Sequence, residues 1–175
     1  MKGIVLGGGC FWCIEAIFQR VKGVQSVISG YSGGTDPEPN YSKVSRHIGN
    51  HAEVVKITYD EGEIGLEELL DIFFHSHDPT TLNKQGADVG PQYRSIVFYA
   101  DESEKKTIEY ALKNAQKDWS QPIVTQVKPL EDFYKAEDYH QNFFNNNPQQ
   151  GYCSVVISPK LHKLQEKYVE LMSHD

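Results

Sequence analysis

The order of short apolar runs and amphipathic segments constrains the fold of this chain most strongly. Four short apolar runs predict strands, at residues 2–8, 24–34, 52–60 and 94–100. Apolar side chains at helical spacing predict helices at residues 12–21 and 66–77. The order strand, helix, strand, strand, helix, strand is that of the split βαβ unit of ferredoxin-like folds. We therefore expect an α+β fold with this unit as its core.

The rest of the chain predicts additions at the C-terminal side of this core. A helix near residues 103–118 opens with Asp101 and Glu104, which have the spacing of a capping box, and a strand is expected at residues 122–128. The polar stretch "FFNNNPQQGYCS" has turn chemistry and predicts a mobile surface loop that carries Cys153. A last helix should begin with Ser158 as its cap and Pro159 as its first residue.

Composition and charge limit the class of protein. The chain has 175 residues, of which 39% are hydrophobic and 23% charged, a balance that suits one globular catalytic domain spanning residues 1–175. The net charge of −7 argues against binding to nucleic acid. No apolar run is long enough to span a membrane, and the start "MKGIVLGGGC" is too short and too rich in glycine for a lipoprotein signal. We expect a cytoplasmic protein.

The three cysteines do not suit a disulfide framework or a metal centre. A secreted, disulfide-stapled domain carries more cysteines and an even number of them. Cys10 and Cys13 supply only two metal ligands, and no second closely spaced pair exists. His75 and His77 lie two residues apart on a helix and so face different directions. We expect no metal and no bound cofactor.

The stretch "GGGCFWC" predicts a reactive thiol at Cys10. Cys10 stands at the start of a helix, where free N–H groups and the helix dipole favour a thiolate. The glycines allow a substrate to approach, and Cys13 lies one helical turn further on, within reach of an oxidised Cys10. Phe11 and Trp12 offer an apolar wall for a small aliphatic group. The alternative, a buried cysteine among core aromatics, explains neither the glycines nor the second cysteine.

Glu53 is a candidate acid because of its place on a strand. Side chains at alternate positions share a face, which puts Glu53 with the apolar Val55 and Ile57. Burial there would keep the carboxyl group protonated near neutral pH. A shifted register or a buried salt bridge is the alternative interpretation.

Several other polar residues have ordinary structural explanations on sequence grounds. Tyr41 and Tyr93 are two of ten tyrosines, and Asp88 suits a turn. Glu15 is explained by the helix dipole alone. The histidines are interpreted as structural or surface residues, namely His51, His75, His77 and His140.

The motif "GGGCFWCIEAIF" resembles the signature of the A-type peptide methionine sulfoxide reductases. The stretches "SGYSGG", "NYSKVSRHIGNHAEVVKITYD", "HDPTTLNKQGADVGPQYRSIVFY", "FYKAEDYHQNF" and "NPQQGYC" resemble further blocks of that family, in the same order, over residues 4–153. Cys13 stands where the family usually has glycine, and Ala87 where it usually has asparagine. Beyond Cys153 no clear similarity remains.

The resemblance implies a reaction and a role for each matching residue. Cys10 would be the nucleophile and Glu53 the acid, with Tyr41 and Tyr93 as hydroxyl donors to the substrate oxygen. Asp88 would be a supporting carboxylate, and Phe11 and Trp12 would hold the methyl group on sulfur. The reaction would reduce methionine S-sulfoxide, free or in proteins, through a cysteine sulfenic acid and an intramolecular disulfide. An external dithiol such as thioredoxin would reduce that disulfide.

Two cysteines compete as the resolving residue. Cys13 is near Cys10 in sequence, whereas Cys153 lies in "GYC", the more usual resolving position of the family that the chain resembles. The sequence favours Cys153, with Cys13 as an alternative or later partner. Two other functions compete with reduction of the sulfoxide. The "CFWC" pair alone would suit a general disulfide oxidoreductase, and Phe11 with Trp12 would suit a noncatalytic module that binds peptides containing methionine.

Overall fold

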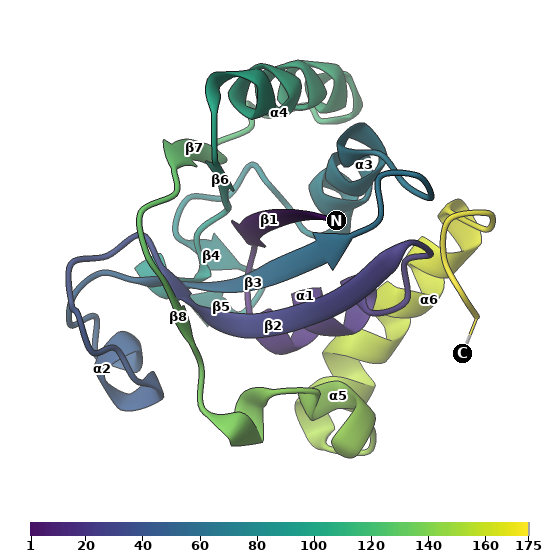
Figure 1. Cartoon of the computed structure of the whole chain (residues 1–175). Helices are drawn as coiled ribbons and strands as arrows, with labels where there is room; N and C mark the ends of the chain where they lie inside the picture. Colours follow the sequence, from purple (N-terminus) through teal and green to yellow (C-terminus); the bar gives the residue numbers. More distant parts are fainter. Residues whose placement is uncertain (175) are drawn as a thin grey trace.

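A computed structural model describes residues 1–174 and shows one curled, six-stranded mixed sheet with helices packed against it (Figure 1). The sheet has the strand order β7-β6-β1-β3-β2-β8. Its central strands are β1 (Lys2–Gly7), β2 (Val24–Ser32), β3 (Ala52–Tyr59) and β6 (Ile96–Tyr99). Helix α1 (Phe11–Phe18) follows β1, and helix α3 (Leu66–Ser76) follows β3.

The predicted α+β fold with a split βαβ core is confirmed. Strand β3 pairs antiparallel with both β1 and β2, and β6 pairs antiparallel with β1. Strand β7 (Gln126–Pro129) runs parallel to β6 at one edge, and β8 (Phe133–Lys135) pairs with β2 at the other. These two strands are additions to the core, and the parallel pairing of β7 makes the sheet mixed.

The other elements surround this sheet. They comprise α2 (Tyr41–Ser45), β4 (Lys84–Gln85), β5 (Asp88–Val89), α4 (Glu102–Ala115), α5 (Phe143–Asn146) and α6 (Ser158–Lys167). Short 3₁₀ turns occur at Pro91–Tyr93, Gln116–Asp118 and Asp138–His140, and a π turn at Cys153–Ile157. None of the helices in residues 1–174 combines the length and apolar character that a membrane crossing needs.

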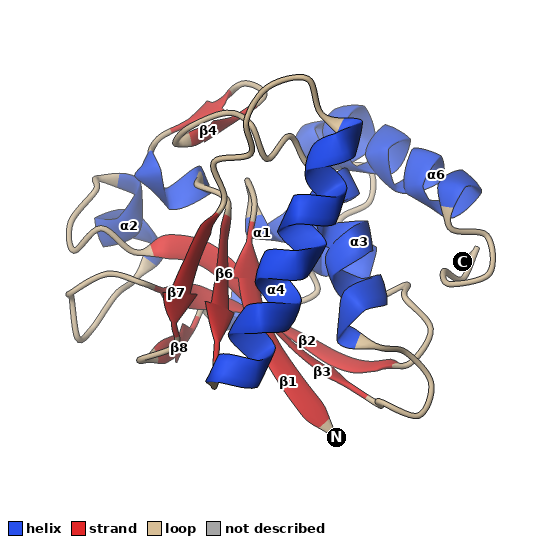
Figure 2. Cartoon of the chain, turned by 90° about the horizontal axis from the view of Figure 1, so that it is seen from above, coloured by secondary structure: helices blue, strands red, loops and turns tan. Residues whose placement is uncertain are grey.

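The main hydrophobic core lies between the sheet and the helices. Helix α4 packs against β6 and β7 (Figure 2), and α1 lies along β2 and β3 (Figure 1). Ile4 of β1 stands directly opposite Ile57 of β3, and both are buried beneath the helices because paired residues share a face. A smaller cluster that includes Val54 and Phe98 covers the other face. The core therefore sits on the face to which Glu53, Val55 and Ile57 belong.

The predicted loop at residues 143–154 is correct only for residues 147–150, which form an exposed turn. Residues 143–146 form α5, and Cys153 begins a helical π turn that continues into α6. Cys153 and Ile157 are fully buried in the main core, so Cys153 does not lie on a surface loop as predicted. Ser158 is already helical, with φ −57°, so it does not cap the helix, and its hydroxyl donates instead to the Cys153 carbonyl.

The start of α4 agrees closely with its predicted capping box. The Asp101 carboxylate accepts a hydrogen bond from the Glu104 backbone N–H at 2.8 Å. The Glu104 side chain accepts from the N–H of Ala100, at 3.0 Å, rather than from that of Asp101.

Candidate active site

A cavity of about 150 Å³ opens where the glycine turn after β1 enters α1. The lining residues come from six separate parts of the chain and are Cys10, Phe11, Trp12, Tyr41, Glu53, Asp88, Tyr93 and Tyr152. Every predicted site residue except Cys13 and Cys153 therefore contributes to one cavity. Tyr152 is an addition that the sequence reasoning missed, although it stands next to Cys153 in "GYC".

The glycine turn places Cys10 at the N-terminus of helix α1. Gly8 packs on the ring of His77, and a Cβ at this position would lie 2.7 Å from that ring. Gly9 has φ +87°, and its N–H donates to the Tyr93 carbonyl at 3.1 Å. Cys10 is the N-cap of α1, with an extended backbone. The prediction that Cys10 lies at the start of a helix is confirmed.

The protonation of the Cys10 thiol differs from the sequence-based expectation. Burial and the nearby Glu53 carboxylate raise the pKa of the thiol well above its usual value. The backbone N–H of Trp12 acts in the opposite direction, as expected at a helix start, but it does not outweigh burial. The resting species is therefore the thiol, and the predicted thiolate is wrong for the free protein.

Glu53 is buried on the apolar face of β3, as its strand register predicts. Burial raises the pKa of its carboxyl group to about 8, and the charge of Asp88 acts in the same direction. The Phe11 backbone N–H donates to Glu53 Oε1 at 3.1 Å and opposes part of this shift. At neutral pH the carboxyl group is protonated and can release a proton inside the cavity.

Three tyrosines and Asp88 complete the polar side of the cavity. The Tyr152 hydroxyl donates to Asp88 Oδ2 at 2.8 Å, which fixes the carboxylate. Burial raises the pKa of the hydroxyl groups of Tyr41 and Tyr93, and the Glu53 charge adds to this effect. Both hydroxyls thus stay protonated and available as donors.

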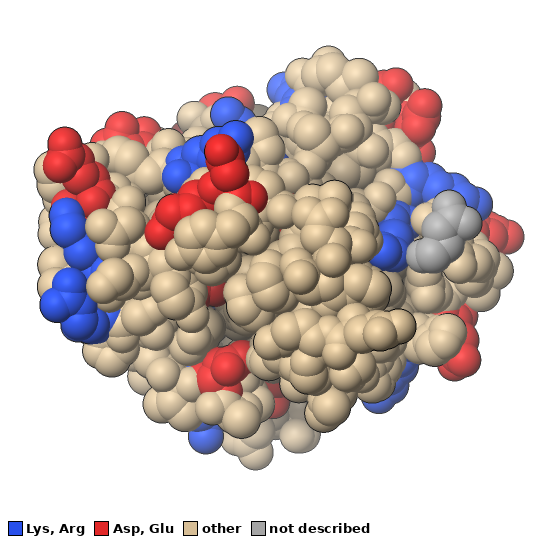
Figure 3. All heavy atoms as spheres, turned by 90° about the horizontal axis from the view of Figure 1, so that it is seen from below, with Lys and Arg blue, Asp and Glu red and all other residues tan. Residues whose placement is uncertain are grey.

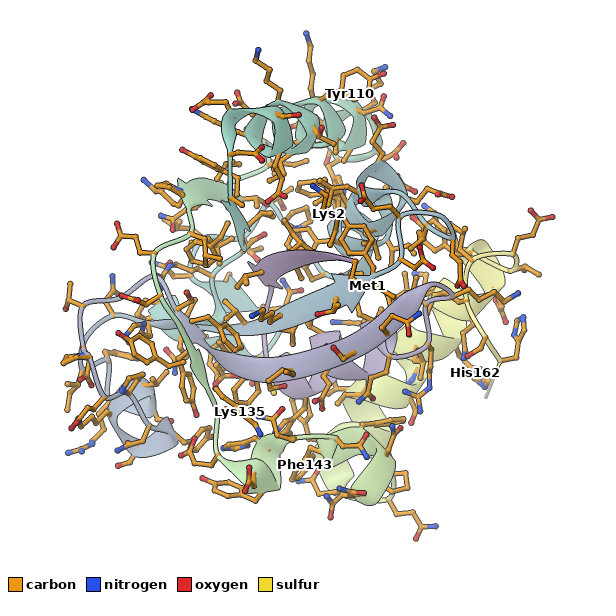
Figure 4. All side chains as sticks on the ribbon, viewed as in Figure 1. Met1, Lys2, Tyr110, Lys135, Phe143 and His162 are labelled. Carbon is orange, nitrogen blue, oxygen red and sulfur yellow. The ribbon has the colours of Figure 1, made fainter. Side chains whose placement is uncertain are left out.

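The apolar side of the cavity rests on a stack of aromatic rings. Trp12 lies flat on Phe143 of α5, with ring centroids 3.6 Å apart and an interplanar angle of 4°. Figure 4 labels Phe143 at the end of the molecule where α5 is drawn. The Trp12 indole Nε1–H donates to His140 Nδ1 at 3.0 Å. His140 is 2% exposed and therefore a buried support of this wall, which the sequence did not reveal.

The other two cysteines lie beneath the cavity. Cys13 and Cys153 are both free thiols in the main core. Burial raises the pKa of the Cys13 thiol, and the ammonium group of Lys160, which hydrogen-bonds to Cys13, opposes that rise. Burial and the neighbouring Cys13 raise the pKa of Cys153. Cys13 also acts on the pKa of Cys10, so its thiol influences both of the others.

Glu15 has a larger role than the helix dipole that the sequence suggested. Its side chain is buried and accepts from the backbone N–H of Asn142 at 3.0 Å and from that of Phe143 at 3.3 Å. Both donors lie at the start of α5, where they have no helical partner. Glu15 therefore fixes α5 against α1, and with it the ring on which Trp12 stacks.

The remaining predicted structural histidines do have structural partners. His77 bonds to the Phe73 carbonyl and to the Ser95 hydroxyl, and His51 accepts from the Gly34 N–H. His75 lies 2.9 Å from the Asp118 carboxylate. None of the three lines the cavity.

A larger cavity, of about 520 Å³, lies elsewhere, around Arg94 and Phe98. It contains no cysteine, and the guanidinium of Arg94 is bonded to the carbonyls of Pro91 and Asn50. The smaller cavity is the candidate active site because it combines a nucleophile with a protonated carboxyl group.

The face seen from below has a broad central area with few charged side chains (Figure 3).

Comparison with known proteins gives a consistent result. The family profile described as "Peptide methionine sulfoxide reductase" matches residues 2–172. "Peptide methionine sulfoxide reductase MsrA" of Psychrobacter cryohalolentis is 52% identical over 172 residues, covering 98% of this chain and 99% of that protein. The protein of the same name from Campylobacter jejuni is 55% identical over 165 residues, covering 94% of this chain and 99% of its own.

Solved structures agree with this. The crystal structure of reduced Mxr1 from Saccharomyces cerevisiae superposes with a TM-score of 0.80 at 36% identity, covering 87% of this chain and 88% of that one. A structure of Mxr1 in complex with Trx2 superposes with a TM-score of 0.57 at 28% identity, covering 79% of this chain and 83% of that one.

Proposed function

The chain belongs to the peptide methionine sulfoxide reductase family, A type, and on that premise we propose that Cys10 reduces methionine S-sulfoxide with Glu53 as the acid. As a member of this family it is a peptide methionine sulfoxide reductase. One observation carries the assignment of roles: in a single small cavity the Cys10 thiol meets a carboxyl group that is protonated at neutral pH.

The first step transfers the sulfoxide oxygen to Cys10. The Cys10 sulfur bonds to the sulfoxide sulfur while Glu53 gives its proton to the oxygen, which is a poor leaving group as an oxide. The hydroxyl group so formed then moves from the substrate sulfur to the Cys10 sulfur. The sulfur–oxygen bond of the substrate and the temporary sulfur–sulfur bond both break, which leaves Cys10 as a sulfenic acid and releases methionine. The thiol proton of Cys10 replaces the proton that Glu53 gave. Sulfur in the substrate is reduced by two electrons, and Cys10 is oxidised by two.

The other cavity residues bind and orient the substrate. The hydroxyl groups of Tyr41 and Tyr93 donate to the sulfoxide oxygen, and Asp88, held by Tyr152, orients the polar side. The rings of Phe11 and Trp12 receive the methyl group on sulfur. A sulfoxide sulfur is chiral, so placing oxygen and methyl on opposite sides selects one epimer, and we assign the S epimer.

Two further thiols return Cys10 to its reduced state. We assign Cys13 the first attack: its thiol displaces water from the sulfenic acid and forms the Cys10–Cys13 disulfide. Cys153 then attacks Cys13, which frees the Cys10 thiol and leaves a Cys13–Cys153 disulfide. The support is the position of Cys13, which acts on the pKa of both Cys10 and Cys153. This order differs from the preference for Cys153 drawn from the sequence.

An external dithiol completes the cycle by reducing the last disulfide and becoming a disulfide itself. We propose thioredoxin, which is supported by the solved complex of the similar protein Mxr1 with Trx2. Proteins, peptides and the free amino acid all remain within the proposed substrate class.

Turnover of the two sulfoxide epimers, assayed separately, tests this function. The protein is incubated with dithiothreitol and either the S or the R epimer of methionine sulfoxide, and methionine is measured by chromatography. We expect methionine from the S epimer only. Methionine from neither epimer, with folded protein and reduced thiols, would leave the noncatalytic binding module as the better explanation, and equal rates would contradict the stereochemical assignment.

A further inference from the structure

His140 contacts the aromatic wall of the cavity from behind without lining it. Its ring centroid lies 5.1 Å from that of Phe11 and 4.7 Å from that of Tyr41. The Trp12 indole N–H donates to His140 Nδ1 at 3.0 Å, although the two residues are 128 positions apart in the chain. His140 thus contacts three residues that line the cavity, Phe11, Trp12 and Tyr41.

The bond to Trp12 determines the protonation of the imidazole ring. An indole N–H is a donor only, so Nδ1 must accept and the ring proton must be on Nε2. His140 Nε2 is buried and has no hydrogen-bond partner among the described residues. Burial lowers the pKa of His140, although the Glu137 carboxylate opposes this, and the ring is therefore neutral near pH 7. The buried, otherwise unpartnered imidazole has the Trp12 indole as its one specific polar contact within residues 1–174.

We propose that His140 is a positioning residue which fixes the Trp12 indole through Nδ1 and so sets the space available to the alkyl group on the sulfoxide sulfur. Trp12 has its face on Phe143 and its N–H on His140, so one contact controls the tilt of the indole and the other its rotation in the ring plane. Without the acceptor, stacking alone permits the indole to rotate and the wall to move. The effect on the substrate rests on the proposed function, whereas the contact between His140 and Trp12 does not.

An NMR measurement tests the bond without reference to activity. The chain has two tryptophans, Trp12 and Trp119, so a ¹⁵N-labelled sample gives two indole N–H signals, and Trp119→Phe assigns them. We compare wild type with His140→Leu, which removes the acceptor, and with His140→Asn, whose amide oxygen can replace Nδ1. Tyr139→Phe serves as the control, because the Tyr139 ring lies 4.2 Å from His140 but does not contact the indole N–H through any described bond.

The expected result is an upfield shift of the Trp12 indole proton and roughly tenfold faster exchange in His140→Leu, the loss that one buried hydrogen bond implies. His140→Asn and Tyr139→Phe should keep the wild-type signal. An unchanged Trp12 signal in His140→Leu overturns the proposal. Because the measurement needs no turnover, this outcome is separate from any failure of the reductase assignment.

Kinetics with two substrates test the consequence for specificity. Methionine sulfoxide and ethionine sulfoxide differ by one methylene on the alkyl group. In His140→Leu we expect about tenfold weaker discrimination against the ethyl group. His140→Asn should restore discrimination, and Tyr139→Phe should keep it. A lost indole bond with unchanged discrimination would overturn the positioning role, and circular dichroism of each variant would show whether the fold is intact.

Discussion

Glu53 and Cys10 line the same cavity, and burial makes a negative charge on either group less favourable. The Glu53 carboxylate is among the causes that raise the pKa of the Cys10 thiol. Burial raises the pKa of Glu53 itself to about 8. The reactive pair is therefore neutral at rest, which suits a reaction that must protonate the substrate oxygen as the sulfur attacks.

Replacement of Cys10 by serine should abolish reduction of methionine sulfoxide and leave the fold intact. Cys10 is the N-cap of α1 and makes no side-chain capping bond, and serine is a preferred N-cap residue. The measurement is methionine formation with dithiothreitol, together with thermal unfolding. Activity near that of the wild type would contradict the role of Cys10 as nucleophile.

Replacement of Glu53 by glutamine should slow the first chemical step by about a hundredfold or more, the usual range for loss of a general acid. The amide oxygen can still accept from the Phe11 N–H, so the geometry should persist. In the wild type the acid form exists below a pH of about 8, so the single-turnover rate should fall as the pH rises through that value. Glu53→Gln should show no such inflection. An unchanged rate would assign protonation to another group.

At the scale of elements, helices α5 and α6 reach the site only through tertiary contacts. Helix α5 supplies the ring beneath Trp12, and α6 supplies Lys160, which hydrogen-bonds to Cys13. The π turn before α6 carries Cys153 into the core. The C-terminal helix thus contributes a charge to the proposed thiol relay.

Replacement of Lys160 by methionine should slow turnover with thioredoxin but leave single-turnover loss of sulfoxide unchanged. Without the ammonium group the pKa of Cys13 rises further, so less thiolate is present to attack the oxidised Cys10. We expect about a tenfold effect, equivalent to one pKa unit. Lys163→Met, an exposed position on the same helix, is the control. Equal turnover in both variants would exclude a role for Lys160.

The cysteine variants separate the two orders of resolution. If Cys13 attacks first, Cys153→Ser should accumulate a Cys10–Cys13 disulfide, and Cys13→Ser should stop after one turnover with Cys10 as a sulfenic acid. Mass mapping after one turnover measures both species. A Cys10–Cys153 disulfide in Cys13→Ser, formed at the wild-type rate, would restore the order that the sequence favours.

Replacement of Glu15 by alanine should lower the free energy of unfolding by about 1–3 kcal/mol, because two backbone N–H groups at the start of α5 lose their acceptor. Urea unfolding of the reduced protein measures this change. Glu109→Ala, at an exposed position of α4, should change stability by less than about 0.5 kcal/mol and is the matched control. Equal effects of the two substitutions would show that Glu15 does not hold α5.

At the scale of the whole molecule, the site adds a pH dependence to stability. The folded protein keeps Glu53 protonated up to a pH of about 8, whereas the unfolded chain ionises it above the ordinary value of 4.5. Between these values the folded state binds more protons than the unfolded chain. The free energy of unfolding therefore has its full value, as far as Glu53 is concerned, below pH 4.5, and it declines as the pH rises to about 8.

Glutamine does not ionise, so Glu53→Gln removes the loss of stability that Glu53 causes in the wild type as the pH rises. The stability of this variant relative to wild type should therefore rise between pH 5.5 and pH 8 by on the order of 1 kcal/mol or more. Urea unfolding at both pH values, with the thiols reduced, measures the difference. Glu109→Ala supplies the control, since its side chain is exposed. A difference that does not change with pH would mean that Glu53 titrates normally in the folded protein.

Local sequence patterns predict the elements of the core, and the family resemblance predicts most residues of the cavity. Periodicity identified the strands and helices of the split βαβ unit, since this signal is local and each element must bury one face. The same alternation placed Glu53 on the buried face of β3, and the glycines before Cys10 marked the turn into α1. The roles carried over by family resemblance led to seven residues that do line one cavity.

Features that depend on contacts between distant segments follow from the folded chain and not from local sequence patterns. The Trp12–His140 bond joins residues 128 positions apart, and Glu15 meets the N–H of Asn142 across 127 positions. The polar composition of residues 143–154 indicated a loop, yet Cys153 is buried because the core supplies the apolar surface that this segment lacks locally. The thiolate expected for Cys10 failed for the same reason: the helix start acts locally, whereas desolvation and the Glu53 charge arise only when the chain has folded around them.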